Sequence, residues 1–316
     1  MEQNIYTDLS EGITCIDTGY LRPQMAACYL VVHNGEAAII ETGTNYTIPR
    51  ITALMEQKGI SKEQIRYVIP THVHLDHAGG VGGLMAIMPN AQLVVHPRGA
   101  RHLIDPAKLI QGTIAVYGEE KYHRLYGDLV PVPAERVIEA EDELKLDLNG
   151  RELLIRHTPG HAEHHFCVWD QQSKGWFSGD NFGLSYREFI GNEKRHIFPA
   201  TTPVHFNPDK MLDSLNLLMS YQPKRFYLTH FCLLEEPQKY VPILKQRIQE
   251  YCDIALANEK TEDPYVGIKQ ALLDLEGNVL ADYIADMSVQ SAKEFIDMDA
   301  ELNAQGLKVW LQRRAA

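Results

Sequence analysis

The sequence predicts an α/β protein, a four-layer αββα sandwich with a C-terminal helical extension. Two strand-rich halves, each with its own helix-like segments, indicate two sheets flanked by helices. The residues beyond about 237 lack strand-like patterns and indicate helices. Candidate metal ligands also recur where predicted strands end, and such positions on a rigid sheet scaffold commonly carry function.

The first half contains short runs rich in Ile, Val and aromatic residues, bounded by Gly and Asn. These runs predict strands at residues 12–17, 27–32, 37–41, 65–70 and 92–96, with a helix over 48–58. The fourth strand leads directly into the sequence His72-Val73-His74-Leu75-Asp76-His77. Because Gly79-Gly80 and a helix-like stretch follow at once, this histidine run is predicted to occupy a strand-to-helix loop. Residues 100–135 are helical in pattern and rich in tyrosine, and they predict an insertion near the site.

The second half repeats the strand pattern of the first. Strands are predicted at residues 143–148, 152–157, 165–169 and 175–178, with a tight turn at Asn149-Gly150. An amphipathic helix is predicted over 209–219, and a final strand over 225–229 ends at His230. One helix of the tail is predicted over 289–302 from the spacing of its apolar residues. We therefore expect a catalytic domain over residues 1–236 and a helical extension over 237–316.

Composition excludes several classes of function. The 42 acidic and 30 basic residues give a net charge of −12, which would repel a polyanion, so nucleic acid is not expected as a partner. No apolar run approaches twenty residues, so no membrane span is expected. The first residues lack a basic or apolar signal region, which predicts a cytoplasmic protein. The five scattered cysteines are typical of reduced thiols.

The histidine run carries the strongest chemical signal. Four candidate ligands within six positions cannot all reach one ion from a loop in unstrained geometry, but they can divide between two ions. Further ligands are available at the ends of predicted strands, namely His161 in Thr-Pro-Gly-His, Asp180 in Phe-Ser-Gly-Asp and His230 in Leu-Thr-His. The structural alternative is a polar loop with one buried histidine. The density of ligands favours a dinuclear metal centre.

The motifs THVHLDHAGG, TPGH, FSGD and LTH together resemble those of the metallo-β-lactamase superfamily of metallohydrolases. The resemblance spans residues 12 to about 232, with the motifs in the family's order. Within that superfamily the histidine run is similar to that of glyoxalase II enzymes and acyl-homoserine lactonases. The loop over residues 198–208 resembles that of a little-characterised prokaryotic subgroup. Glyoxalase II enzymes bind glutathione with basic residues on their tail, which residues 237–316 do not match.

The resemblance implies a fold, a ligand set and a reaction. His72, His74 and His161 would hold a first metal ion, and Asp76, His77 and His230 a second, with Asp180 bridging them. The ions would be zinc first, with iron or manganese as alternatives. A bridging hydroxide would attack a thioester, ester or lactone carbonyl of a small acyl substrate. Asp76 would relay a proton, and Tyr186 or His205 would hydrogen-bond the oxyanion. The resemblance leaves a homodimer open.

One position departs from the family pattern. The superfamily usually has Asp where this chain has Glu41 in Ile-Ile-Glu-Thr-Gly, a residue that orients a metal ligand in relatives. The extra methylene would shift the metals or require a change of backbone. The alternative interpretation is a carboxylate at a strand end that faces water.

Other interpretations stay open at the level of sequence. Some relatives with similar ligands are diiron or mono-iron redox proteins. The diiron ones generally need a flavin domain, and no flavin-binding segment is evident here. A phosphodiesterase would use the same pair of metals, and a non-catalytic module would only bind them. The tyrosines at positions 117, 122 and 126 either line an acyl pocket or pack the insertion, and packing is the default.

Overall fold

The computed structural model of the chain describes residues 5–191, 194–202 and 204–315. The described residues form two compact units. Unit 1 takes those of Met1–His157, His164–Gly179 and Pro223–Glu235, and unit 2 takes those of Thr158–Glu163, Asp180–Gln222 and Glu236–Ala316. The predicted domain boundary at residue 236 stays a prediction.

The first sheet of unit 1 has seven strands in sequence order. They are β1 (Tyr6–Asp8), β2 (Ile13–Asp17), β3 (Ala27–His33), β4 (Glu36–Ile40), β5 (Ile65–Ile69), β6 (Gln92–Val95) and β7 (Val137–Glu139). Strands β1 to β4 pair antiparallel, and β4 to β7 pair parallel. The five predicted strands of this half are confirmed. Strands β1 and β7 were not predicted, because each is three residues long and contains no buried residue.

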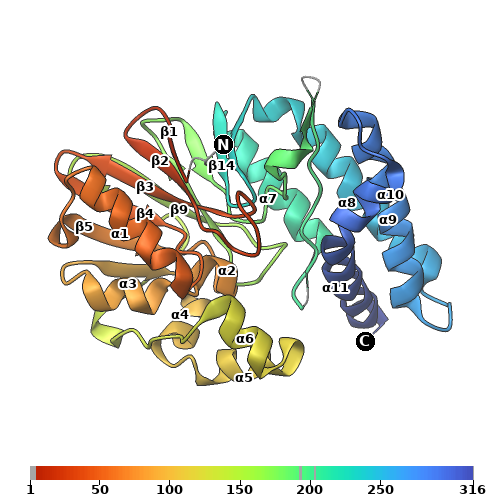
Figure 1. Cartoon of the computed structure of the whole chain (residues 1–316), viewed down its shortest axis with the longest axis horizontal. Helices are drawn as coiled ribbons and strands as arrows, with labels where there is room; N and C mark the ends of the chain where they lie inside the picture. The colour runs from red at the N-terminus through yellow and green to blue at the C-terminus, as the bar shows by residue number, and fades with distance from the viewer. Residues whose placement is uncertain (1–4, 192–193, 203, 316) are drawn as a thin grey trace. The chain divides into compact units, whose positions relative to one another are not determined.

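Strand β3 shows how this sheet separates two cores. Its side chains alternate between the two faces, so that Cys28 and Leu30 enter one buried cluster while Tyr29 and Val31 enter another. The first cluster is covered by α1 (Ile48–Gln57), α3 (Val81–Ile87) and α4 (Pro97–Ile104). Figure 1 shows α1 and α3 beside strands β3 to β5. The second cluster joins the first sheet to the second.

The second sheet of unit 1 has six strands. Its order is β15 (Cys232–Glu235), β14 (Arg225–Leu228), β11 (Gly175–Phe177), β10 (Phe166–Asp170), β9 (Arg151–His157) and β8 (Lys145–Leu148). The turn at Asn149-Gly150 is confirmed, since both residues have positive φ (48° and 97°), as a two-residue hairpin turn requires. The expectation that residues 225–229 form the last strand is wrong. Strand β15 follows and pairs antiparallel with β14.

The predicted insertion is helical and reaches the histidine run. It comprises α4, α5 (Ala107–Tyr117) and α6 (Glu119–Tyr126). Tyr122 and Tyr126 are buried in a cluster with Leu75, the residue between His74 and Asp76. These two tyrosines therefore pack the insertion against the run. The Tyr117 side chain lies outside the described part of the chain.

Unit 2 is mainly helical. Its helices are α7 (Pro208–Ser220), α8 (Val241–Asn258), α9 (Pro264–Tyr283), α10 (Val289–Phe295) and α11 (Asp297–Ala315), and it also carries the short hairpin β12 (Ile190–Gly191) and β13 (Lys194–Arg195). Helix α9 packs against α8, α10 and α11. The helix predicted over 289–302 is interrupted at Ile296, where α10 gives way to α11.

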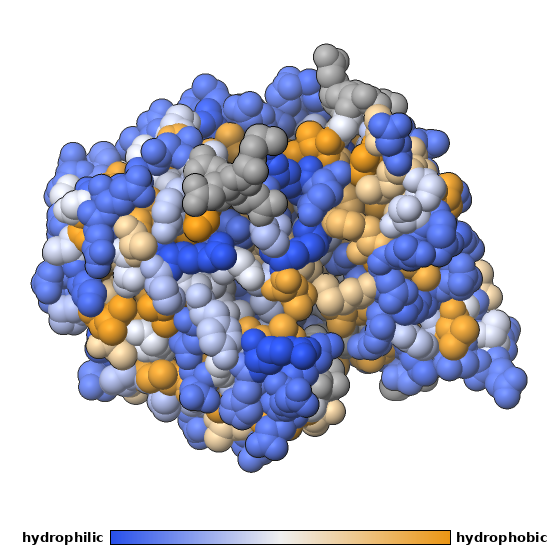
Figure 2. Space-filling view, in the orientation of Figure 1, coloured by the Kyte–Doolittle hydropathy of each residue, from blue (hydrophilic) through white to orange (hydrophobic). Residues whose placement is uncertain are grey.

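Apolar surface is scattered over the chain. In Figure 2 hydrophilic side chains cover much of the visible face, and hydrophobic residues appear between them in separate patches. Among the described residues, no helix combines the length and apolar character needed to cross a bilayer.

Candidate metal centre

The histidine run begins just after β5 and continues into a helical turn. Thr71 to Val73 form the connection, and α2 (Leu75–Ala78) starts within the run, with His74 as its N-cap. The predicted strand-to-helix loop is confirmed. His72 and His77 are fully buried, whereas His74 and Asp76 are partly exposed. The run therefore presents both sheltered and accessible ligand atoms.

Asp76, His77 and His230 form one group of candidate ligands within unit 1. One ligand atom from each lies within 4.8 Å of the others, a spacing that could hold a metal ion. Asp76 Oδ2 lies 3.8 Å from His77 Nε2 and 3.5 Å from His230 Nε2. His230 reaches this place from the connection between β14 and β15. The sequence prediction that these three residues converge is consistent with this geometry.

His72 and His74 form a second ligand pair in unit 1. His72 Nε2 and His74 Nδ1 lie 2.9 Å apart. Two nitrogen ligands of one tetrahedral ion, each about 2.0–2.1 Å from the metal, would be separated by roughly 3.4 Å. The two ring nitrogens lie at hydrogen-bond distance, closer together than two ligands of one ion, so they are near neighbours that a bound ion would separate slightly.

His161 and Asp180 form a ligand pair within unit 2. His161 Nε2 lies 3.5 Å from Asp180 Oδ2, and both side chains are buried. His161 follows Gly160, whose φ of 143° and close approach to the Met211 backbone leave no room for a side chain. The glycine of Thr-Pro-Gly-His thus allows the turn that carries His161.

Backbone carbonyl groups fix the protonation of two of these histidines. His161 Nδ1 lies 2.9 Å from the carbonyl oxygen of Ala200, and His230 Nδ1 lies 3.0 Å from that of Met25. A carbonyl oxygen can only accept a hydrogen bond, so each Nδ1 carries a proton. In the neutral ring the lone pair is then on Nε2, the atom that faces the carboxylate. This arrangement is the usual outer support of a metal-ligating histidine.

Glu41 gives the same kind of support to His77 directly and to His72 through Thr71. Its carboxylate accepts hydrogen bonds from the Thr71 backbone N–H (3.1 Å), the Thr71 hydroxyl (2.5 Å) and the Thr229 hydroxyl (3.1 Å). His77 Nδ1 lies 3.0 Å from Glu41 Oε1 and donates to it. Because the Thr71 hydroxyl proton is directed at Glu41, its oxygen accepts from His72 Nδ1 at 3.1 Å. His72 and His77 therefore also keep the lone pair on Nε2.

The burial of Glu41 decides between the two interpretations of its departure from the family pattern. Its side chain is 1% exposed, so the alternative of a carboxylate facing water is wrong. Its φ is 60°, in the left-handed region that non-glycine residues rarely adopt. Burial raises the pKa of the nearby Cys28 thiol, and the Glu41 charge adds to that rise.

Glutamine at position 41 is expected to weaken metal binding by about 10–100-fold, the usual cost of losing an outer partner of a ligand. The amide nitrogen introduced by Glu41→Gln would meet a hydrogen-bond donor in either orientation, the Thr71 N–H or the group of His77, Thr71 and Thr229, so the support of His77 would be weaker. Chelator competition measures the change. Glu56→Gln, on the exposed face of α1, is the matched control. Equal metal affinity of the Glu41→Gln variant and wild type would show that Glu41 does not orient the ligands.

The variant Glu41→Asp tests whether the extra methylene of Glu41 is needed. If the backbone at φ 60° is adapted to Glu, the shorter Glu41→Asp side chain will not reach His77 and Thr71 together. We therefore expect weaker metal binding than in wild type, measured by the same competition. Wild-type affinity in this variant would mean that the extra methylene has no role.

The remaining predicted residues lie elsewhere. The Tyr186 hydroxyl is buried and donates to Asp299 Oδ1 at 2.6 Å, so its only proton is not directed at a substrate in this arrangement. His205 is half-buried in the loop before α7, and its substrate role stays a prediction. Sequence reasoning missed Thr71 and Thr229. The available signal was the dipeptide Thr-His, which occurs in both Thr71-His72 and Thr229-His230.

Comparison with known proteins identifies a family and a fold. A model described as the metallo-beta-lactamase superfamily matches residues 21–230. The metallo-beta-lactamase fold-containing protein ST1585 of Sulfurisphaera tokodaii is 26% identical over 253 residues, covering 77% of this chain and 88% of the relative. The atrochrysone carboxyl ACP thioesterase of Aspergillus fumigatus is 26% identical over 253 residues, covering 79% of this chain and 65% of the relative.

Two solved structures share the fold. The crystal structure of ST1585 has a TM-score of 0.65 at 21% identity and covers 95% of this chain and 99% of its own. A metallo-beta-lactamase family protein of Thermus thermophilus, TTHA1429, has a TM-score of 0.65 at 19% identity and covers 96% of this chain and 94% of its own. The predicted fold class, a mixed α/β protein with two sheets flanked by helices, is confirmed.

Proposed function

The chain belongs to the metallo-β-lactamase superfamily, and on that basis we propose that it is a dinuclear metal-dependent hydrolase of a small thioester, ester or lactone. The observation that carries the proposal is a set of four buried imidazoles, each of which has its Nδ1 proton held by a hydrogen bond to an oxygen atom. Structural histidines need no common protonation state. Four that all keep the lone pair on Nε2 suit the chemistry of metal ligands.

We propose that His72, His74, His161 and Asp180 hold one ion and that Asp76, His77 and His230 hold the other. Asp180 would also bridge the two, because a carboxylate offers one oxygen to each ion. Imidazole and carboxylate donors suit zinc best, with iron or manganese as alternatives. The donor set thus fits two divalent ions.

Two such ions supply Lewis acidity, which activates water and polarises an acyl carbonyl. The protein residues then have defined tasks. Glu41, Thr71 and the two backbone carbonyls hold the imidazoles in one protonation state and orientation. We propose that the part-exposed Asp76 carboxylate would accept and relay a proton of the attacking water.

The substrate class is proposed from chemistry and from relatives. A thiolate or stabilised alkoxide leaves without a side-chain acid, which suits a site whose titratable groups are engaged as ligands. One relative is named as a thioesterase that acts on an acyl carrier protein. We propose a small acyl substrate for this chain and a cytoplasmic location, with no nucleic acid as partner.

The first experiment is a screen of the purified, metal-loaded protein with thioesters, lactones, esters, β-lactams and phosphodiesters. We expect hydrolysis of at least one acyl class, its loss on treatment with a strong chelator, and its return when zinc or manganese is added back. Metal analysis of protein from its native host runs beside the screen. A dominant iron content with visible absorption would favour a redox protein. Turnover of phosphodiesters alone would favour that class, and no turnover with two metals bound would favour a non-catalytic module.

A further inference from the structure

One loop of unit 2 contacts the turn that carries His161 at two points. The carbonyl oxygen of Ala200 accepts from His161 Nδ1 at 2.9 Å. Seven residues later the Asn207 backbone N–H donates to the carbonyl oxygen of Gly160 at 2.8 Å. The position of this loop therefore decides where the Ala200 acceptor lies and how the His161 ring is held.

Helix α11 is bonded to the Ala200 end of that loop. Asn303 Oδ1 accepts from the Thr201 backbone N–H at 2.6 Å and from the Thr201 hydroxyl at 2.9 Å. The same hydroxyl also lies 3.0 Å from the Asn303 carbonyl oxygen. Thr201 is fully buried and Asn303 is 3% exposed, so these bonds are shielded from water and hold the loop firmly to α11.

Gly306, one turn further along α11, confirms how closely helix and loop approach. A Cβ atom at this position would lie 1.5 Å from the Thr201 carbonyl oxygen. A side chain there would push the loop away. The absence of a side chain at Gly306 is therefore required by the contact with Thr201.

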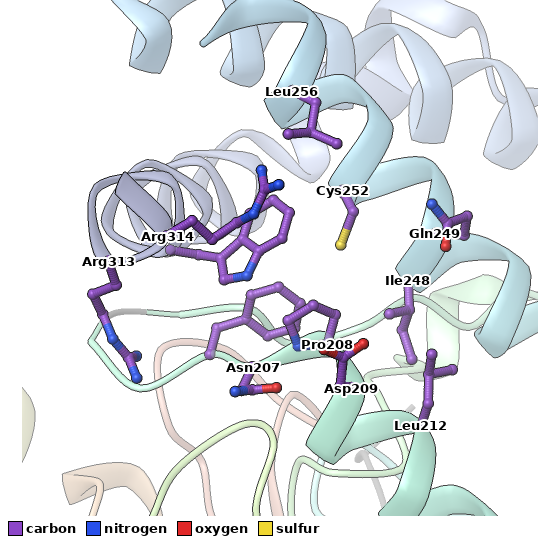
Figure 3. A pocket seen from close by; sticks show the side chains of 12 residues that line it. Asn207, Pro208, Asp209, Leu212, Ile248, Gln249, Cys252, Leu256, Arg313 and Arg314 are labelled. Carbon is purple, nitrogen blue, oxygen red and sulfur yellow. The ribbon is translucent and has the colours of Figure 1, made fainter. Parts of the chain in front are cut away.

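The other end of the loop is held less tightly. Phe206 meets the ring of Trp310 with 6.3 Å between centroids, and Arg313 donates to the Val204 carbonyl oxygen at 3.0 Å. This end borders a cavity of about 390 Å³ between α7, α8 and α11. Figure 3 shows Asn207 and Arg313 at its edge. The buried bonds of Asn303 are thus the tight part of the contact.

We infer that Asn303 is a positioning residue for His161. By holding Thr201 it fixes the adjoining Ala200 carbonyl, and that carbonyl keeps the proton on Nδ1 and leaves Nε2 able to bind metal. This assigns a role at the centre to the C-terminal helix α11. The inference rests on the proposed function, in which His161 is a ligand.

The test compares Asn303→Ala with wild type, with His161→Ala and with Asn278→Ala. Asn278 is an exposed asparagine of α9 whose side chain bonds only within its own helix among the bonds described, so it controls for the substitution itself. Zinc affinity is measured by chelator competition, and the protonated nitrogen of each histidine by ¹H–¹⁵N spectroscopy of the metal-free protein. Gly306→Ala moves the same loop by a different route and serves as a second variant.

We expect Asn303→Ala to weaken the binding of one zinc ion by about tenfold, the lower end of the range for outer partners of a ligand. We also expect the His161 signal to lose its fixed Nδ1–H form, while Asn278→Ala matches wild type in both measurements. Gly306→Ala should change them in the same direction. A merely structural role would lower the melting temperature and leave the histidine signal unchanged.

The outcomes separate the two proposals. If wild type binds two zinc ions, His161→Ala loses one, and Asn303→Ala and Gly306→Ala bind like wild type with an unchanged His161 signal, the positioning role is overturned. If His161→Ala itself binds zinc like wild type, the ligand set of the proposed function fails instead.

Discussion

Alanine in place of Asp180 is expected to lower the turnover of any acyl substrate that wild type hydrolyses by at least about 10³-fold, because groups that act as one unit cannot be removed singly without losing most of the rate. Asp180 is 5% exposed and its Oδ2 lies 3.5 Å from His161 Nε2. On the proposed function it is also the bridge between the ions. Its loss therefore removes a ligand from both.

The measurement is kcat with metal content and thermal stability of the same preparation. Asp213→Ala, an exposed aspartate on α7 in the same unit, is the matched control and should keep wild-type turnover. We expect Asp180→Ala to remain folded, to bind less metal and to lose turnover. A folded Asp180→Ala protein with wild-type kcat would exclude Asp180 as the bridge.

The largest loss of stability is expected at Arg151, at the start of β9. Its guanidinium makes two hydrogen bonds to the Asp170 carboxylate, at 2.9 and 2.5 Å, and a third to the Glu11 carbonyl oxygen at 2.6 Å. Both charged side chains are fully buried. Arg151→Met leaves the Asp170 charge buried without its partner, and we expect a loss of about 3–5 kcal/mol in the free energy of unfolding.

Urea unfolding followed by fluorescence measures this loss. A control is available between β8 and β9, where Lys145 and Glu152 form an ion pair at 3.1 Å with both side chains exposed. Lys145→Met should change the free energy of unfolding by less than about 1 kcal/mol, since exposed pairs contribute little. Similar small losses in both variants would mean that the buried pair contributes no more than the exposed one.

The sequence predicted strands that contain buried apolar residues, and it missed strands with no buried residue, such as β1 and β7, and a strand after an unusual turn. Strand β15 illustrates the reason. It is joined to β14 by Thr229, His230 and Phe231, and pairing resumes at once between Leu228 and Cys232. This connection carries a candidate ligand in place of the Gly and Asn residues that mark hairpins. With a candidate ligand at this turn in place of a hairpin signal, the strand that follows was not predicted.

The candidate ligands could be named from sequence because each lies in a compact motif. Apart from Glu41, their supports could not. Asn303 lies 102 residues from Thr201 in sequence, and Met25 lies 205 residues from His230. Moreover, the Met25 and Ala200 groups that contact the histidines are backbone carbonyls, which every residue type provides. No pattern of side chains can therefore reveal them, and only the folded chain shows which carbonyl faces which ring.

Supports from main-chain oxygens and supports from side chains respond differently to substitution. His161 and His230 take their orientation from main-chain oxygens, and substituting Ala200 or Met25 leaves those oxygens in place. The support of His77 comes from Glu41, which a single codon change can replace. A substitution at position 41 is therefore expected to change how His77 is held, whereas the hydrogen bonds to His161 and His230 persist in variants of Ala200 and Met25 that keep the backbone in place.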